Sequence, residues 1–364
     1  MPHYGPSSHR VMIWQGGEPE WAICTGKAVR PPQNLCFLTH TRASMEFVER
    51  LRKGAQSTVK AKTRLLQRGR RNRLPQIRGY FDFSSPKSIS TNAAVVLAAE
   101  YERLRMMSLE IPYTVDLHRW NDDVFRKLYQ IGFFEIVGIS PERPDVVIEE
   151  GDTRTMRIVS MKNADDLAKV DNALQALGKF MLPVHAIPES VMIDVLTGLS
   201  EAISNVTNHA YPAGYQPDYP HVGRLWVSAT ADRRDNSLTV VVYDQGITIP
   251  ITYPRISRRE EVMNYLGRTL KQTGSFEFQN DGTYIRAAMK YGGSRTDKEY
   301  RGKGLPQMIS TIERVGRGSM AVLSRGGWCL RDTNGRFRSG SFPHSIGGTL
   351  VEWKVELSRV EMVQ

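Results

Sequence analysis

The stretch Glu189–Pro212 reads ESVMIDVLTGLSEAISNVTNHAYP, and it decides how the C-terminal part of the chain is interpreted. Its apolar residues recur at helical spacing and are expected to form one buried stripe: Met192, Val195, Leu196, Leu199, Ile203 and Val206. Glu201 and Asn205 lie one turn apart on the opposite face. A carboxylate and a carboxamide so placed can activate a nucleophile and hold a magnesium ion. A solvated face of an ordinary amphipathic helix has the same pattern, so the downstream residues must decide.

Two strand-like segments follow this helix, at 224–230 and 237–243, and the second one leads into Asp244, Gln245 and Gly246. An aspartate at the end of a buried strand can accept the amino proton of an adenine. A glycine two residues later lets the base approach the backbone closely. Asp-x-Gly is also an ordinary turn signal, so this motif is ambiguous when it is taken alone.

A second glycine-rich segment contains Gly302, Lys303 and Gly304, and it precedes a helix that is expected to start near Pro306. Glycines before a helix N-terminus expose backbone amides and the positive end of the helix dipole, which suits a phosphate chain. Lys303 could add a point charge. The segment is neither a Walker loop nor a Rossmann fingerprint, because the required spacings are absent.

A third segment, Gly348 and Thr349, opens an alternating, strand-like stretch at 346–357. A glycine pair before such a stretch is also typical of a simple hairpin turn. Each of these three segments is therefore weak evidence, and their order along the chain carries the information.

Taken in order, the helix and the three segments resemble the Bergerat-fold ATPases, the GHKL superfamily of gyrase, heat-shock chaperones, histidine kinases and mismatch-repair proteins. Leu199–Tyr211 resembles the helical Asn box, especially that of the anti-sigma-factor serine kinase branch. The segments that begin at Asp244, Gly302 and Gly348 resemble the three glycine boxes. The resemblance covers residues 180 to 358. It implies a Bergerat-fold α/β sandwich in which a mixed sheet carries helices on one face.

The resemblance also implies roles for individual residues and the cofactors ATP and Mg²⁺. Asn205 is expected to bind a Mg²⁺ ion that bridges the nucleotide phosphates. Glu201 is the expected general base, which deprotonates an attacking hydroxyl or water. Asp244 is expected to bond the adenine, with Gly246 beneath it and Thr349 supporting the same site.

The remaining implied parts are a phosphate cradle and a lid. Gly302–Gly304 would hold phosphates, and the segment 251–301 would be the lid, with its hinge near 292–296. Thr248 stands where the superfamily usually has a second glycine. This departure weakens the expectation of catalysis more than that of nucleotide binding. No His-Glu-x-x-Arg-type helix precedes the region, which disfavours a classical autophosphorylating histidine kinase.

The net charge of +11 is concentrated in residues 50–78, which contain no acidic residue. The basic residues of this segment are Arg50, Arg52, Lys53, Lys60, Lys62, Arg64, Arg68, Arg70, Arg71, Arg73 and Arg78. Such a block can neutralise nucleic-acid phosphates or an acidic partner. It lacks aromatic residues for base stacking, and a solvated basic helix or linker explains it equally well. The periodicity predicts a helix over 44–66 after several short strands.

Residues 76–150 alternate strand and helix, which indicates a small sheet covered by helices. Helices are expected at 92–107 and 122–131, and a further strand-like segment at 145–148. Asp82–Thr91 and Leu128–Gly138 resemble parts of the STAS domain of anti-sigma-factor antagonists. In that family a serine that follows an aspartate at the start of the first helix accepts phosphate. The aligned positions here are Ser90 and Thr91, without the aspartate. The alternative is that one of them only caps the helix.

The composition is that of a globular protein, with 40% hydrophobic and 24% charged residues. No apolar run is long enough to span a bilayer, and the first residues do not resemble a signal peptide, so a cytoplasmic protein without a membrane partner is expected. Cys24, Cys36 and Cys329 are odd in number and unclustered, so we expect reduced thiols rather than disulfides or a zinc site.

The sequence thus predicts an α+β chain with a basic N-terminal region (1–75), a STAS-like domain (76–150) and a GHKL ATP-binding domain (151–364). The expected function is an ATP-Mg²⁺-dependent regulatory switch that acts on a protein partner, with serine/threonine kinase-like transfer if it is catalytic. Two alternatives remain open. One is a slow ATPase clamp that forms a homodimer on ATP binding, and the other is a non-catalytic adaptor whose basic segment binds nucleic acid.

Overall fold

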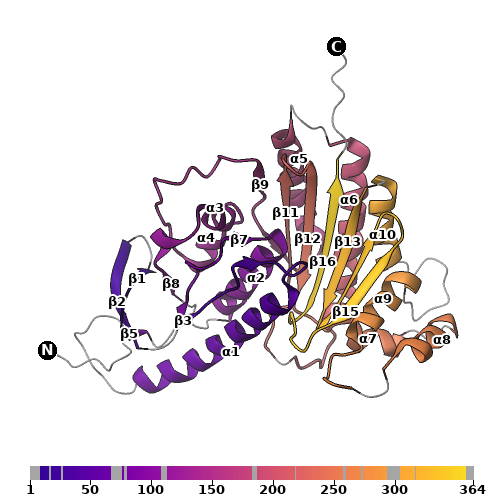
Figure 1. Cartoon of the computed structure of the whole chain (residues 1–364), viewed down its shortest axis with the longest axis horizontal. Helices are drawn as coiled ribbons and strands as arrows, with labels where there is room; N and C mark the ends of the chain where they lie inside the picture. The colour runs from indigo at the N-terminus through magenta and orange to yellow at the C-terminus, as the bar shows by residue number, and fades with distance from the viewer. Residues whose placement is uncertain are drawn as a thin grey trace, which may run out of the picture. The chain divides into compact units, whose positions relative to one another are not determined.

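The computed structural model of the chain divides into two compact units, Met1–Glu150 and Gly151–Gln364 (Figure 1). It describes residues 9–15, 18–25, 28–66, 76–77, 80–107, 113–182, 187–217, 219–256, 260–271, 274–292, 304–315 and 317–357. Within these ranges, no helix combines the length and the apolar character that crossing a bilayer requires. Each unit contains both helices and strands, so the chain is α+β.

The first unit is built around a hairpin of β1 (His9–Gln15) and β2 (Glu18–Cys24). β8 (Thr114–Val115) pairs antiparallel with β1, and β5 (Gln76–Ile77) pairs parallel with β2. Residues on both sides of position 75 therefore share one sheet. Two short parallel pairs accompany it: β3 (Ala28–Val29) with β6 (Tyr80–Phe81), and β4 (Asn34–Leu35) with β7 (Ser88–Ile89).

The helices of the first unit are α1 (Thr41–Leu66), α2 (Thr91–Met106), α3 (Asp122–Gln130) and α4 (Phe133–Val137). The short helix η1 (Leu117–Arg119) precedes α3. α2 is buried along most of its length because its sequence is rich in alanine, valine and leucine. The hydroxyl of Ser90 caps α2 and accepts a hydrogen bond from the Ala93 amide at 3.3 Å.

The strand expected at 145–148 is wrong, because this segment forms turns. Its carbonyl groups bond to side chains of α3 instead of to a neighbouring strand. The Nε atom of Arg126 donates to the Val147 carbonyl at 3.0 Å, and the Nε2 atom of Gln130 donates to the Ile148 carbonyl at 2.9 Å. The apolar pattern of 145–148 did not distinguish a strand from a turn segment whose carbonyl groups bond to side chains.

The second unit contains a large sheet with the strand order β10-β11-β12-β16-β13-β14-β15, to which β9 adds beside β11 (Figure 1). The strands are β9 (Thr153–Thr155), β10 (Val159–Met161), β11 (Leu225–Asp232), β12 (Ser237–Asp244), β13 (Gly318–Ser324), β14 (Gly327–Asp332), β15 (Phe337–Ser341) and β16 (Thr349–Glu356).

This sheet is antiparallel at every strand pair among the described residues, so the expectation of a mixed sheet is wrong. β12 and β13 run in the same direction, since each pairs antiparallel with β16. They are not neighbours, because the last strand of the chain inserts between them. Hairpins supply most of the other pairings.

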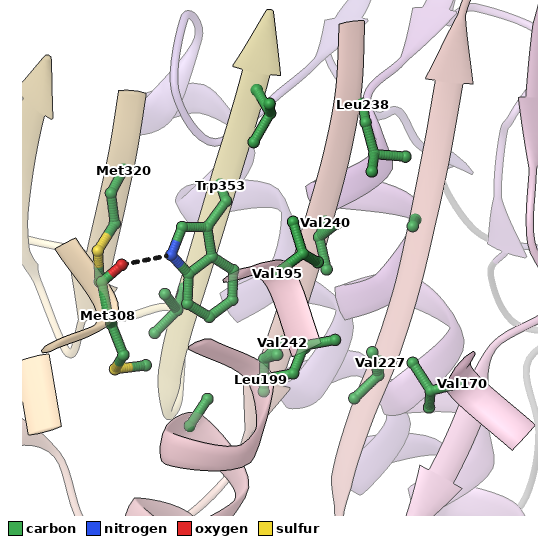
Figure 2. Packing of buried hydrophobic residues seen from close by; sticks show 14 of the residues in the cluster. Val170, Val195, Leu199, Val227, Leu238, Val240, Val242, Met308, Met320 and Trp353 are labelled. Carbon is green, nitrogen blue, oxygen red and sulfur yellow. Dashed lines mark hydrogen bonds between the residues drawn. The ribbon is translucent and has the colours of Figure 1, made fainter. Parts of the chain in front are cut away.

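Helices α5 (Leu167–Met181), α6 (Glu189–Asn205), α9 (Asp281–Tyr291) and α10 (Gly304–Val315) share a hydrophobic core with one face of this sheet. Figure 2 shows Leu238, Val240 and Val242 of β12 and Trp353 of β16 packed with Val195 and Leu199 of α6 and Met308 of α10. The indole Nε1 of Trp353 donates to the Met308 carbonyl at 3.0 Å, which ties β16 to α10 (Figure 2). A smaller core joins α7 (Ile249–Ile256) and α8 (Glu260–Thr269) to α9.

Candidate functional site

The helix that carries the predicted polar pair is α6, and its stripe is buried as expected at Met192, Val195, Leu199, Ile203 and Val206, while Leu196 is half-buried. Glu201 and Asn205 are half-buried. Within the described residues, the Glu201 carboxylate has no hydrogen-bond or ion-pair partner. Immediately after Asn205 the chain forms a single π-helical turn, η3 (Val206–Ala210), a feature that is frequent at functional sites.

α6 packs against α10 along its length, and three contacts fix the alignment of the two helices. Near the start of α6, Arg314 forms an ion pair with Asp194 at 2.7 Å, and the Thr311 hydroxyl donates to the Asp194 carbonyl at 3.1 Å. Gly198 permits this approach, because a Cβ atom there would lie 2.8 Å from the Thr311 hydroxyl. Neither helix can therefore slide without losing these contacts.

The third contact lies at the opposite end of α6. Gly304, the first residue of α10, is so close to the Asn205 side chain that a Cβ atom would lie 2.7 Å from Nδ2. The same Nδ2 atom lies 3.8 Å from the Met308 sulfur. The carboxamide of Asn205 thus lies beside the N-terminal end of α10, where unsatisfied backbone amides are expected.

The loop after β12 contacts Ala210, the last residue of η3, and Tyr211, which follows it. A side chain at Gly246 would overlap the Ala210 carbonyl, and the Ile247 amide donates to this carbonyl at 2.6 Å. The Gln245 amide donates to the Tyr211 hydroxyl at 3.0 Å. The close approach requires glycine at position 246, and it brings the end of the Asn205 helix next to Asp244.

A row of polar side chains crosses the sheet beside this loop. Asp244 pairs with Thr349, and Thr349 pairs with Ser324, so the three residues end β12, start β16 and end β13. Residues directly opposite in antiparallel strands share a face, and this row lies on the face that packs against the helices. The hydroxyl oxygens of Ser324 and Thr349 are 2.8 Å apart. A side chain at Gly348 would overlap the Asp244 carbonyl.

Two further groups give this end of the sheet its polarity. The Thr248 side chain is buried, and among the described residues its hydroxyl oxygen has no hydrogen-bond partner. A buried hydroxyl without a partner is uncommon in a native structure, so the Thr248 hydroxyl is a candidate contact for a ligand or a water molecule. The Tyr211 hydroxyl donates to the Arg224 carbonyl, and burial, followed by the nearby Asp244 carboxylate, raises its pKa. Tyr211 is therefore protonated at neutral pH.

Burial raises the pKa of Asp244 to about 7, although the Gly246 amide, which donates to its Oδ1 atom at 2.8 Å, opposes the shift. A buried carboxylate with one backbone partner lacks most of the hydrogen bonds that stabilise its charge. It is therefore suited to accept a hydrogen bond from a ligand.

The side chains at this end of the sheet offer few metal ligands, and they fit only a metal ion that is held mainly by a bound ligand. Among the described residues, no group of three or more His, Cys, Asp or Glu side chains is placed to hold an ion. Asn205 supplies a single amide oxygen. Mg²⁺ commonly takes one or two protein ligands and completes its octahedron with phosphate oxygens and water, so this donor fits a metal that arrives with a phosphate chain.

The structure brings together most of the residues singled out from the sequence: Asn205, Asp244, Gly246, Gly304 and Thr349 lie at one end of the sheet and its covering helices. Gly302, Lys303 and the hinge segment at 293–296 lie outside the described residues. Ser324 and Tyr211 also lie at this end of the sheet, and neither was predicted from the sequence as a site residue. A serine closing the apolar strand β13 was the available signal for Ser324, but its position beside Thr349 depends on pairing between distant strands.

The basic segment lies only partly within the described residues, which exclude 67–75, 78 and the side chains of 55–66. Its first three basic side chains all contact glutamates. Arg50 pairs with Glu46, Lys53 pairs with Glu49 at 2.5 Å, and Arg52 is buried against Glu100. These three residues therefore serve the helix and the core of the first unit.

Comparison of the chain with protein-family models and with curated proteins finds no match.

Proposed function

We propose that the unit Gly151–Gln364 is a GHKL-type, Bergerat-fold domain that binds ATP with Mg²⁺. One observation carries this proposal: three segments distant in sequence converge at one end of the sheet. They are the end of α6 with Asn205, the loop after β12 with Asp244, and the start of β16 with Thr349. These are the segments whose order along the chain resembles the superfamily.

In the proposed complex, Asp244 accepts the amino proton of adenine, and Thr349 supports the same edge of the base. The burial of Asp244 supports this role, because a hydrogen bond from a ligand compensates a desolvated carboxylate. Because Gly246 has no side chain, the loop lies directly against Ala210, and in the proposed complex this part of the loop lies beneath the base. The unpartnered hydroxyl of Thr248 lies in the same loop and, among the described residues, is a further candidate contact.

The phosphates lie at the start of α10 in this proposal, next to Gly302 and Lys303. The contact between Gly304 and Asn205 supports the assignment, since it puts an amide oxygen beside a helix N-terminus that favours anions. Asn205 would hold the Mg²⁺ ion, which neutralises phosphate charge when it is bound.

The proposed reaction is kinase-like transfer to a serine or threonine of a protein partner. Glu201 takes the proton from the acceptor hydroxyl, the acceptor oxygen bonds to the γ-phosphorus, and the bond from that phosphorus to the β,γ-bridging oxygen breaks, which releases ADP. Glu201 lies one turn before Asn205 on α6. Its carboxylate has no hydrogen-bond or ion-pair partner among the described residues, which supports this role. We propose that the STAS-like first unit supplies the contact with the partner.

Binding is tested by calorimetry with ATP in the presence and absence of Mg²⁺. Wild type is expected to bind, Asp244→Ala to lose binding, and Asn205→Ala to lose the dependence on Mg²⁺. Asn208→Ala is the matched control, because the Asn208 side-chain amide donates to the Ser204 carbonyl of α6, one turn earlier, at 2.8 Å. An absence of ATP binding by wild type overturns the proposal.

The reaction is tested with γ-labelled ATP by following labelled protein and free phosphate separately. Transfer predicts label on protein that disappears in Glu201→Gln, while ATP binding persists. Ser90→Ala and Thr91→Val test transfer to the chain itself. Free phosphate without label on this chain contradicts transfer to Ser90 or Thr91, and free phosphate that persists without labelled protein when a cell extract is added as the source of partners favours the ATPase clamp.

A further inference from the structure

Two arginine side chains meet on one aromatic ring in the second unit. The guanidinium carbon of Arg286, on α9, lies 5.8 Å from the centroid of the Phe337 ring, and that of Arg331, on β14, lies 5.6 Å from the same centroid. Arg331 and Phe337 are directly opposite in β14 and β15, so their side chains share a face of the sheet. Both guanidinium groups therefore border one site.

The face of β14 that carries Arg331 is the one that the helices cover. Cys329, two residues earlier on the strand, is fully buried in the core that the sheet shares with α9 and α10. Burial raises the pKa of the Cys329 thiol to about 12, and the nearby positive charge of Arg286 opposes this shift. The two arginines thus belong to different elements and lie at the same part of β14.

The hydrogen bonds of the two guanidinium groups are incomplete. Arg331 forms an ion pair through Nη2 with Glu313, near the end of α10. Its Nη1 atom and the Nε atom of Arg286 are buried, and neither has a hydrogen-bond partner among the described residues. Guanidinium groups keep their charge at any physiological pH, and a buried N–H group without an acceptor costs free energy. A further acceptor between the two arginines would remove this cost.

The charges at this site are unbalanced as well. Within the part of the chain that the structure describes, Glu313 is the one carboxylate that forms an ion pair with either arginine. A positive charge that is mostly buried and uncompensated is unfavourable, so the missing acceptor is better supplied by an anion than by water. The Glu313 side chain is 48% exposed and that of Arg331 is 14% exposed, so an ion can reach the site from the side of Glu313.

We propose that Arg286 and Arg331 bind a phosphate group between α9, α10 and the β14–β15 hairpin. Arginine suits phosphate because its N–H groups form paired, charge-assisted hydrogen bonds with the oxygens. A phosphate group presents oxygens in several directions and can accept from two guanidinium groups on different elements, whereas the two oxygens of a carboxylate lie in one plane.

This site is separate from the proposed nucleotide site, and the proposal does not depend on it. Gly304, at the start of α10, lies beside Asn205. Glu313 lies about 13 Å further along the same helix, at a rise of about 1.5 Å per residue. A phosphate held by Arg286 and Arg331 is therefore a second ligand rather than part of the nucleotide.

Calorimetric titration of the full chain with inorganic phosphate, at constant ionic strength, tests the proposal. We expect wild type to bind with a Kd on the order of 1 mM. Arg286→Gln and Arg331→Gln should each lower the affinity at least about tenfold, because each loses a charged donor to the ligand. Arg338→Gln is the matched control and should bind as wild type does, since Arg338 is exposed on β15 next to Phe337.

Glu313→Gln gives a test of opposite sign. It removes the negative charge that competes for Arg331, so we expect phosphate to bind about two- to fivefold more tightly. An ion pair that only stabilised the fold would not raise the affinity when it is broken. If a glutamine variant of either arginine does not fold, as judged by circular dichroism, the corresponding lysine variant keeps the charge but not the paired donors, and it should still bind more weakly than wild type.

Two further ligands define what the site accepts. Binding of glycerol 3-phosphate as well as inorganic phosphate would assign the site to phosphorylated molecules, and binding of inorganic phosphate alone would assign it to the free ion. Acetate that binds as tightly as phosphate overturns the assignment to phosphate. The proposal is also overturned if wild type binds no phosphate, or if binding is unchanged in Arg286→Gln and Arg331→Gln, since the ion would then occupy another site. ATP binding is measured separately, so either result leaves the proposed function standing.

Discussion

Gly304 lies directly against the carboxamide of Asn205, with room for a hydrogen at its Cα atom but not for a methyl group. The two residues belong to different helices, and their contact sets where α10 begins relative to the end of α6. Because backbone amides are exposed at a helix N-terminus, this contact fixes the distance between an amide oxygen and an anion-binding end.

The first prediction concerns this contact. In Gly304→Ala the added methyl group meets the Asn205 Nδ2 atom at 2.7 Å, so either the side chain or the start of α10 must move. We expect the affinity for ATP with Mg²⁺ to fall at least about tenfold, which corresponds to about 1.4 kcal/mol. The measurement is calorimetric titration of both forms.

Gly267→Ala in α8 is the matched control, because a Cβ atom there meets no heavy atom within 4 Å. Alanine in an exposed helix is expected to raise the free energy of unfolding by about 0.5–1 kcal/mol and to leave ATP binding unchanged. Equal ATP affinity in the two alanine variants would show that the geometry between Asn205 and Gly304 does not matter for binding.

The second prediction follows from the raised pKa of Asp244, from 3.8 to about 7. Burial, the main cause, favours the protonated form in the folded state, so between these two values the folded protein binds more protons than the unfolded chain. The free energy of unfolding therefore falls as the pH rises from about 4 to 7 and loses this pH dependence above 7.

Asp244→Asn removes this titration while it keeps an oxygen acceptor for the Gly246 amide. Since one pKa unit corresponds to about 1.4 kcal/mol, we expect the variant to be more stable than wild type at pH 8 by on the order of 2–4 kcal/mol. The difference should shrink toward pH 4. Urea unfolding across this pH range measures it, and a constant difference contradicts the assignment to Asp244.

Local sequence patterns were sufficient for much of the fold. The helices expected at 92–107 and 122–131 are confirmed within a residue as α2 and α3, because periodicity and helix-ending residues act over short distances. The strand order was not predictable in the same way. The insertion of β16 between β12 and β13 depends on pairing across most of the second unit, which no local pattern records.

The candidate site shows the same division. Asp244 and Thr349 were singled out because each stands at an end of a recognisable strand with a glycine nearby. Ser324 has no such motif, and it joins them only through the register of β16 with β13. Likewise, the need for glycine in the loop at position 246 comes from the carbonyl of Ala210, which belongs to η3 and is distant in the sequence.

The third prediction concerns Asp281, which is buried at the start of α9 and held by the turn between β13 and β14. Arg325 donates to both carboxylate oxygens, at 2.6 and 2.8 Å, and the Gly326 amide donates to one of them at 3.0 Å. Arg325 also adopts the left-handed backbone region, with φ of 54°, which a non-glycine residue disfavours. The ion pair therefore stabilises both the turn and the start of α9.

We expect Arg325→Ala to lower the free energy of unfolding by about 3–5 kcal/mol, because it leaves the buried Asp281 charge without its cationic partner. The double variant Arg325→Ala with Asp281→Asn should recover part of this loss. Arg234→Ala, which removes a solvent-exposed ion pair with Asp152, is the control and should change stability little. If adding Asp281→Asn does not reduce the loss seen in Arg325→Ala, the effect belongs to the turn rather than to the charge.

The fourth prediction concerns a buried ion cluster in the first unit. Glu100 on α2 is fully buried and accepts from Arg52 of α1 at 2.6 Å and from Arg103 at 3.0 Å. Burial alone would raise the pKa of Glu100, but the two guanidinium groups outweigh it and hold the pKa below its ordinary value of 4.5. The cluster therefore contributes stability above that pH and loses it as the pH falls through the lowered pKa.

Removal of one member should cost more than replacement of all three. Glu100→Ala leaves two buried guanidinium groups without their shared carboxylate, and we expect a loss of about 3–5 kcal/mol in the free energy of unfolding. The triple variant Arg52→Met, Glu100→Leu, Arg103→Met removes the charges together and should lose much less. Urea unfolding of the full chain at pH 7 measures both. If the triple variant loses as much as Glu100→Ala, apolar side chains cannot replace the ion cluster, and its contribution lies in its hydrogen-bond geometry rather than in charge compensation.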